Sequence, residues 1–188
     1  MDDLQGHSIY NLENAIWHSA IMNEFDILLD LHNEIDAVFF RHQCSLLNFD
    51  FIRALEELEE YESLLLRHMK DEEDFLLPIY AERAKMEKAG EAKIFLDDHE
   101  KMRIYVEQFK DQTIKLAGEE HPENGLLLLL DRESFYKRLN SHHDKREREH
   151  LYPSLNMICS ESEKDELLSH LMCKVKEDDS ASRAQIPV

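Results

Sequence analysis

Glycine, proline and cysteine are all scarce in this chain of 188 residues. Only four Gly and four Pro are present, and a sheet protein of this length would need more of them for its turns, so long helices are favoured. The cysteines, Cys44, Cys159 and Cys173, are widely spaced and form no C-x-x-C pair. This spacing disfavours both a disulfide scaffold and a zinc-thiolate site, and we expect a reducing, cytoplasmic setting.

Long apolar runs and positive charge are also in short supply. The longest aliphatic run is Leu126 to Leu130, far too short to span a membrane, and the Met1 end shows no basic-then-apolar secretory signal. The formal net charge of -19 repels phosphate backbones and anionic lipids, so we expect neither nucleic-acid nor membrane binding. Hydrophobic residues make up 43% of the chain, which suits one globular domain.

Helical periodicity extends through most of the sequence and predicts an all-α protein. Apolar residues recur at helical spacing over residues 8–40, 49–85, 91–117 and 126–157, and over a shorter segment at 161–176. Short connections between these segments predict an up-down-up-down antiparallel four-helix bundle with a short C-terminal helix. We expect the bundle to occupy residues 1–176 and residues 177–188 to be a disordered acidic and polar tail.

Each long segment carries an apolar stripe that is interrupted by polar residues. The stripes are Ala15, Phe25, Leu28, Ile35 and Phe39; Phe51, Leu55, Leu58, Leu65, Phe75 and Ile79; Ala92, Phe95, Met102, Val106, Phe109 and Leu116; and Leu128, Phe135, Tyr136 and Leu139. The interruptions are His18, His68, His99 and His143, with Glu72 and Glu147 one turn further on. Burying these groups without partners would cost several kcal/mol, whereas a metal ion would supply the missing partner.

The spacing of the four histidines predicts that they share one level of the bundle. In an antiparallel hairpin, two residues at the same height are equally far from the turn. The midpoint is 43 for His18 and His68, 83.5 for His68 and His99, and 121 for His99 and His143. Each midpoint falls at or beside a predicted turn. The first of these turns is the stretch Arg41–Asn48.

A weak internal repeat supports the same site. The stretch from His68 to Pro78 aligns without gaps on the stretch from His143 to Pro153, and both read H-x-x-x-E with proline ten residues after the histidine. Each half therefore donates one histidine from its first helix, and one histidine and one glutamate from its second. This pattern predicts a pseudo-two-fold pair of metal ions that two carboxylates bridge.

Several other polar residues are interpreted as lying outside the site. His32 lies fourteen residues from His18, about 21 Å along a helix, which excludes it from the same centre. His150 follows His143 on one stripe and is interpreted as a packing or supporting residue, with a role as a fifth histidine ligand left open. Glu73 and Glu100 point about 100° away from their ligand neighbours, so we expect them to be solvated.

In the two H-x-x-x-E motifs and the two further histidines, the chain resembles the hemerythrin-like, or HHE cation-binding, domain family over about residues 8–157. The resemblance implies two iron ions, one bound by His18 and His68 and the other by His99 and His143, with Glu72 and Glu147 as bridges. Imidazole and carboxylate ligands also suit zinc or manganese, and the preference for iron comes from the family.

The ligand pattern departs from that of the oxygen-carrying hemerythrins, whose third helix supplies H-x-x-x-H. Here Arg103 stands four residues after His99. The resulting set of four histidines and two glutamates is closer to the di-iron domain of iron-sulfur cluster repair proteins, although their cysteine-bearing N-terminal extension is absent.

Three functions follow from these patterns. The first is an iron, oxygen or nitric oxide binding or sensing protein, with a small diatomic ligand as its partner. The second is a di-iron enzyme of nitrosative or oxidative stress that reduces nitric oxide or peroxide, or repairs iron-sulfur clusters. The third, a metal-free helical interaction domain, leaves the inward polar residues unexplained and ranks last. The sequence does not choose between binding and catalysis.

Overall fold

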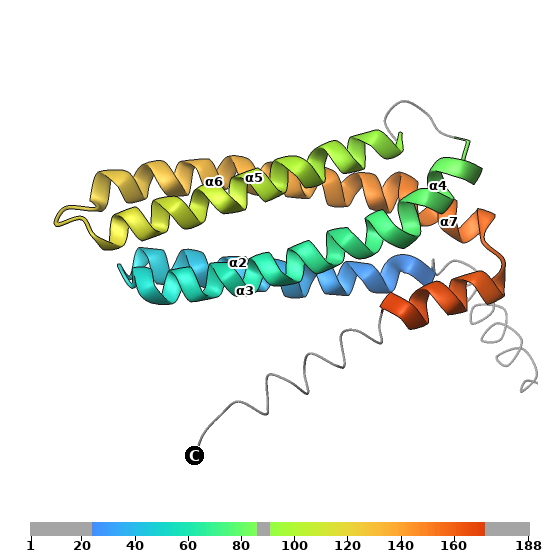
Figure 1. The fold of residues 1–188 in the computed structure, drawn as a ribbon, viewed down its shortest axis with the longest axis horizontal. Coiled ribbons are helices and arrows are strands. Elements are labelled where there is room, and N and C mark those ends of the chain that lie inside the picture. Colours follow the sequence, from blue (N-terminus) through green and yellow to red (C-terminus); the bar gives the residue numbers. More distant parts are fainter. Residues whose placement is uncertain (1–23, 86–90, 172–188) are drawn as a thin grey trace, which may run out of the picture.

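The computed structural model describes residues 24–85 and 91–171, which form helices and turns and contain no strand. In chain order the elements are η1 (Glu24–Asp26), α2 (Ile27–Leu47), α3 (Phe51–Asp71), the π-helical turn η2 (Glu72–Leu76), α4 (Leu77–Arg83), α5 (Ala92–Ala117), α6 (Glu123–Arg146), the π-helical turn η4 (Glu147–Leu151) and α7 (Tyr152–Ile158). The long helices α2, α3, α5 and α6 lie side by side, with shorter helices at one end (Figure 1). Residues 161–171 are also helical.

The up-down-up-down antiparallel bundle and its short C-terminal helix are confirmed in these residues. The helices pair as the hairpins α2–α3 and α5–α6, and α3 also packs against α5. No helix within residues 24–85 and 91–171 combines the length and the apolar character needed to cross a membrane. The predicted tail, residues 177–188, lies outside the described residues.

The first turn of the bundle lies further along the chain than the sequence analysis placed it. The stretch Arg41–Asn48 was predicted as a loop, but α2 continues to Leu47. The chain reverses at Asn48–Asp50, where Phe49 adopts a left-handed backbone conformation with φ of 58°. Asp50 then caps α3, because its Oδ1 atom accepts a hydrogen bond of 3.0 Å from the backbone N–H of Arg53.

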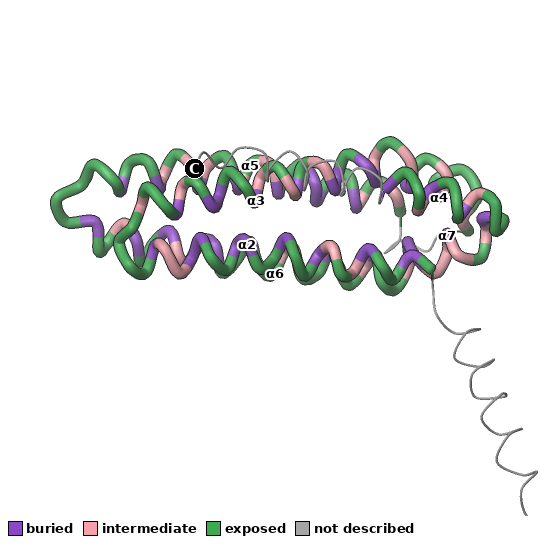
Figure 2. Tube along the Cα trace, turned by 90° about the horizontal axis from the view of Figure 1, so that it is seen from below, coloured by how far each residue is buried: buried purple, intermediate pink, exposed green. Residues whose placement is uncertain are grey.

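Buried residues line the inner sides of the long helices (Figure 2). The predicted stripes on α2 and α5 are buried from Phe25 to Phe39 and from Phe95 to Leu116. The stripe predicted on α6 is partly wrong, since Leu128 and Phe135 are 66% and 60% exposed. Leu126 and Leu129 occupy the buried face instead. Leu129 lies seven residues before the buried Tyr136 and shares its face, whereas Leu128 and Phe135 each stand one residue earlier, about 100° around the helix.

A π-helical turn shifts the buried face of the α3–η2–α4 rod. Before the turn, Leu58 and Leu65 are buried as predicted, but after it Phe75 and Ile79 are only half-buried. A π-helical turn holds one more residue than an α-helical one, so it rotates the following residues around the helix axis. The core beyond the turn is therefore formed by Leu76, Leu77 and Tyr80.

The apolar core has two parts. One fills the long bundle around Phe39, Leu58 and Phe109. The other lies at the end that carries α4 and α7, and there the helix at 161–171 contributes Leu167 and Leu171. The polar residues that the sequence placed in the core lie on the stretches of helix between these two parts.

Candidate metal centre

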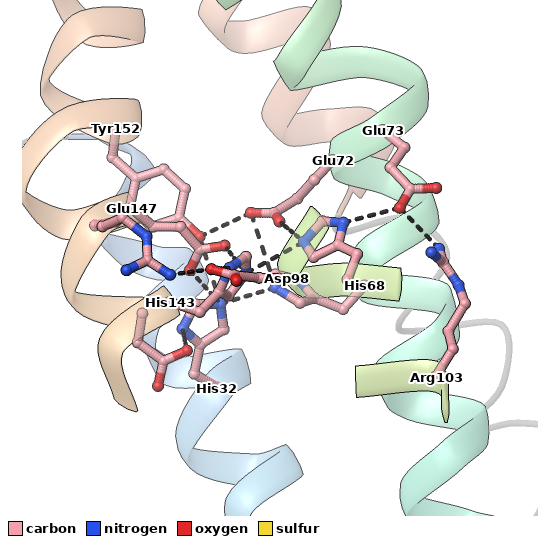
Figure 3. A network of polar contacts seen from close by, with 12 residues as sticks. His32, His68, Glu72, Glu73, Asp98, Arg103, His143, Glu147 and Tyr152 are labelled. Carbon is pink, nitrogen blue, oxygen red and sulfur yellow. Dashed lines mark hydrogen bonds and ion pairs between the residues drawn. The ribbon is translucent and has the colours of Figure 1, made fainter. Parts of the chain in front are cut away.

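Five of the six predicted ligand residues come together in the interior of the bundle (Figure 3). His68 and Glu72 come from α3 and η2, His99 from α5, and His143 and Glu147 from α6 and η4. All five are buried. The sixth predicted residue, His18, lies outside the described residues.

The interpretation of His32 was wrong, because the structure places this residue in the same cluster. The Nε2 atom of His32 lies 2.9 Å from the Nε2 atom of His68. A turn at Arg41–Asn48 would pair His68 with His18. The chain reverses instead at Asn48–Asp50, and the midpoint of residues 32 and 68 is 50, at the reversal itself. The N-cap residue Asp50 was the local signal that could have located this turn.

The residues form two groups of four that share both carboxylates. One group holds His32, His68, Glu72 and Glu147; the other holds His99, His143, Glu72 and Glu147. Within each group, every residue offers one ligand atom within 4.8 Å of the others. His150, which was left open as a fifth histidine, belongs to neither group.

The two histidine pairs have the geometry of metal ligands. The Nε2 atoms of His99 and His143 lie 3.2 Å apart, close to the 2.9 Å between those of His32 and His68. Two imidazole nitrogens bound at about 2.1 Å to one ion, at roughly a right angle, would be about 3 Å apart. Each pair therefore fits two neighbouring positions around one cation.

The shared carboxylates also fit a cation. Glu72 and Glu147 are 1% and 0% exposed, and the oxygens that face the centre lie beside imidazole nitrogens: Glu147 Oε1 is 2.7 Å from His143 Nε2, and Glu72 Oε2 is 3.3 Å from His99 Nε2. Burial, reinforced by the neighbouring Glu72 carboxylate, raises the pKa of Glu147 well above its usual range. A divalent ion between the two carboxylates would satisfy these oxygens and stabilise both charges.

The imidazoles of His32 and His143 differ in charge because their neighbours differ. Burial and the adjacent His68 lower the pKa of His32 to about 3, so His32 is neutral and ready to bind a metal ion. Burial would also lower the pKa of His143, but the carboxylates of Glu147 and Asp98 outweigh it and raise this pKa to about 10. A metal ion at His143 would therefore have to displace a proton.

Glu73 was expected to be solvated, and this was wrong. Its Oε1 atom accepts hydrogen bonds of 2.8 Å from His99 Nδ1 and 2.7 Å from Arg103 Nη2. Since a carboxylate only accepts, the hydrogen of the His99 ring lies on Nδ1, and the Nε2 lone pair is directed toward the centre. Glu73 opens the π-helical turn together with Glu72, and from there it reaches across to α5.

Carboxylates also lie on the outer sides of two other histidines. Asp144 Oδ1 is 3.6 Å from His32 Nδ1, and Asp98 Oδ2 is 3.9 Å from His143 Nδ1. Asp98 is in turn bound by Lys101 and Arg146. Burial raises the pKa of Asp144 to about 6. These distances exceed direct hydrogen bonds, so both carboxylates act on the histidines through charge.

Tyr152 is a further polar residue at the centre that sequence reasoning missed. Its hydroxyl donates a hydrogen bond of 3.1 Å to Glu72 Oε1 and lies 3.4 Å from His32 Nε2. The internal repeat aligns Tyr152 with Leu77. A hydroxyl at the position where the other half has an apolar side chain was the signal that could have identified it.

Both glutamates open a π-helical turn. The backbone carbonyl of Glu72 accepts from the N–H of Leu77, and that of Glu147 accepts from the N–H of Tyr152, five residues on in each case. Pro78 and Pro153 follow directly, and because proline has no N–H, regular α-helical bonding cannot resume at that residue. Such turns are frequent at functional sites, and here each begins with one of the two carboxylates that both groups share.

No protein-family model matches the chain, and comparisons with curated proteins and with solved structures also find no match. The class of protein is therefore defined by fold and site alone. The chain is an all-α helical bundle in which buried histidine and glutamate clusters can hold a metal ion.

Proposed function

We propose that this chain is a hemerythrin-like protein that binds a carboxylate-bridged pair of non-haem iron ions and acts as an iron, oxygen or nitric oxide binding or sensing protein. The observation that carries the proposal is the sharing of Glu72 and Glu147 by two histidine pairs. Two adjacent cation positions with two common carboxylates are the arrangement that a bridged metal pair requires. His32 and His68 would hold one ion, and His99 and His143 the other.

The choice of iron rests on the resemblance in the repeated H-x-x-x-E motifs, each with proline ten residues after the histidine. Histidine and carboxylate ligands also suit zinc and manganese, which are the alternative metals. The bound iron pair would supply redox chemistry and positions for a small ligand. The protein's own residues would hold the ions, orient the imidazoles and keep bulk water out.

The size of the space beside the centre favours a small ligand. A cavity of about 10 Å³ is lined by residues that include His32, His68 and His143, together with Met69 and Met102. This volume is close to what a single water molecule needs. So small a space favours a diatomic ligand such as oxygen or nitric oxide, because a larger substrate would have to rearrange the core.

The proposal is tested by metal content. The protein would be purified without added metal and then loaded anaerobically with ferrous iron, with metal per chain measured before and after loading. We expect two iron ions per chain, one for each group of ligands, and visible absorption from a bridged ferric pair after oxidation. Preferred binding of zinc or manganese would overturn the redox part, and no stoichiometric metal would overturn the whole proposal.

A second candidate function is a di-iron enzyme that reduces nitric oxide or peroxide, or takes part in iron-sulfur cluster repair. The position of Tyr152 favours it, because a hydroxyl 3.1 Å from Glu72 Oε1 can donate a proton at the edge of the centre. Turnover separates the two functions. An enzyme would consume nitric oxide or peroxide catalytically in the presence of a reductant, whereas a carrier or sensor would only bind it stoichiometrically.

A further inference from the structure

Two hollows adjoin each other at the seam between α2 and α6. The inner one is the cavity of about 10 Å³ beside His32 and His68. The outer one has a volume of about 230 Å³, with Tyr61 and Tyr136 among its lining residues. Asp36, Asn140 and Asp144 line both hollows, so they form the boundary between the outer space and the candidate centre.

Polar groups from both helices meet at this boundary. Asn140 Nδ2 on α6 donates a hydrogen bond of 3.2 Å to Asp36 Oδ1 on α2, which closes the seam. One turn further on, Asp144 Oδ1 lies 3.6 Å from Nδ1 of His32. The His32 side chain is only 9% exposed, and its Nδ1 atom has no hydrogen-bond partner among the described residues. A buried nitrogen without a partner therefore faces a carboxylate at the inner end of the seam.

The balance of charge along the seam favours a cation. Asp36 and Asp144 contribute two carboxylates, against one ammonium group, that of Lys137, in the outer hollow. Lys137 Nζ donates to Gln43 Oε1 at 2.9 Å. Carboxylate and amide oxygens are ligands that hard divalent cations accept readily, and a cleft lined by one sign of charge concentrates ions of the opposite sign.

One cation position has both of its histidines at the inner cavity, whereas the other has only His143 there and not His99. His32 and His68 both line the inner cavity. On the other side, the Nδ1 atom of His99 is covered by Glu73 and its partner Arg103. His143 lines the inner cavity as well, but its Nδ1 side faces Asp98, which Lys101 and Arg146 bind.

We propose that divalent cations reach and leave the centre through the α2–α6 seam, with Asp36 and Asp144 as transient ligands, and that the His32–His68 position exchanges its ion first. This inference rests on the proposed function, since it assumes that the centre binds metal. It adds two positioning residues and a route that the ligand set alone does not define. It also makes the two cation positions kinetically different.

The test is the rate at which metal-free protein takes up ferrous iron under anaerobic conditions, followed by stopped-flow competition with a coloured chelator. Asp144→Asn and Asp36→Asn remove the proposed transient ligands. Asp131→Asn removes the same charge from an exposed position on the same helix and serves as the matched control. We expect uptake to slow by about tenfold in the two seam variants, the lower end of the effect of a focusing field, while the control keeps the wild-type rate.

The final stoichiometry separates a route from a structural role. Seam variants that load slowly but reach the wild-type metal content support the proposal. If the seam variants take up iron at the rate of the Asp131→Asn control, the proposal is overturned. A loss of bound metal without a change in rate also overturns it, because Asp144 would then only orient His32. If wild-type protein takes up no metal, the proposed function itself has failed, which is a distinct outcome.

A steric variant tests the route without changing charge. Ser141 is exposed and lines the outer hollow, so Ser141→Trp should obstruct it. Ser134→Trp, one heptad earlier on α6 and also exposed, is the control. We expect slower uptake only for Ser141→Trp, and equal rates for the two variants would overturn the proposed route. In wild-type protein, chelator extraction should be biphasic, with the fast phase slowed in Asp144→Asn; a single phase would overturn the order of exchange.

Discussion

The Nε2 atoms of His32 and His68 lie 2.9 Å apart at the same level of the α2–α3 hairpin, although 36 positions separate the two residues. This distance defines one of the two proposed cation positions. His32→Ala should therefore lower the metal content from two ions per chain to about one, since the other group keeps its four ligands. The measurement is metal per chain after anaerobic loading and desalting.

His142→Ala is the matched control for this variant. His142 is exposed and adjoins the candidate ligand His143, so its loss should leave the metal content unchanged. Equal metal content in His32→Ala and His142→Ala would contradict the assignment of His32.

Glu73 is expected to set the orientation of the His99 ring. Glu73→Gln keeps the size of the side chain but replaces the carboxylate that accepts from His99 Nδ1. Loss of such an outer partner typically lowers metal affinity by about 10- to 100-fold. Chelator competition measures the affinity, with Glu100→Gln, an exposed neighbour of His99, as the control. If the two variants bind metal equally well, the charge of Glu73 does not contribute to metal binding at His99.

A second buried polar network joins His42 and Gln43 on α2 to Glu133 on α6. His42 and Glu133 each lie ten residues from a candidate ligand on the same helix, so we expect the network to affect stability and not metal binding. His42 Nε2 and Gln43 Nε2 contact the two carboxylate oxygens of Glu133 at 2.9 and 2.8 Å, and His42 Nδ1 donates to the backbone oxygen of Ala54 at 2.7 Å. Glu133→Ala would leave His42 Nε2 and Gln43 Nε2 without the carboxylate that they share, and breaking such a buried pair costs about 3–5 kcal/mol of unfolding free energy.

Denaturant unfolding at a fixed metal concentration measures this cost. Asp131→Ala, two residues away and exposed, should change the unfolding free energy by no more than about 0.5 kcal/mol. Metal per chain should remain at the wild-type value in both variants. If the Glu133→Ala variant binds less metal under conditions in which it is still folded, the network also supports the centre.

The tyrosine pair in the core predicts a loss of stability at alkaline pH. The hydroxyls of Tyr61 and Tyr136 bond to each other, and burial raises the pKa of both phenols above the usual range. Above about pH 10 the unfolded chain releases these protons while the folded protein keeps them, so stability falls as pH rises. At one unit above that pH the loss is about 1.4 kcal/mol for each phenol.

The double variant Tyr61→Phe with Tyr136→Phe isolates this effect. Its unfolding free energy should decline less steeply between about pH 9 and 11 than that of the wild type, because it has no phenol to ionise at these two positions. Urea unfolding at a series of pH values provides the comparison. Parallel pH dependence in both proteins would show that the pair does not hold its protons more tightly than the unfolded chain does.

Local patterns in the sequence were sufficient to predict the four-helix bundle and to select five of the residues in the two candidate groups. The reason is that the H-x-x-x-E spacing and the apolar stripes depend only on helix periodicity. Choosing between His18 and His32 depended instead on the end of α2. That end is determined by the cap at Asp50 and by the left-handed conformation of Phe49, which stripe periodicity does not reveal.

The outer partners of the site were not predictable in the same way. Glu73 reaches His99 from a π-helical turn, and a helical wheel with 3.6 residues per turn places it on the wrong face. Tyr152 and Asp144 approach Glu72 and His32 from another helix. Such contacts depend on how the helices pack against each other, so they cannot be predicted from the sequence of one helix.

The paired π-helical turns restrict how the length of this chain can change in evolution. Deleting one residue from 72–76 or from 147–151 would restore an α-helical turn and rotate all that follows by about 100°, carrying Tyr80 or Leu155 away from the core that they now fill. The connection between Ala117 and Glu123 carries no such constraint. Insertions and deletions should therefore accumulate in the loops, while a descendant that keeps this centre keeps ten residues from histidine to proline in both halves.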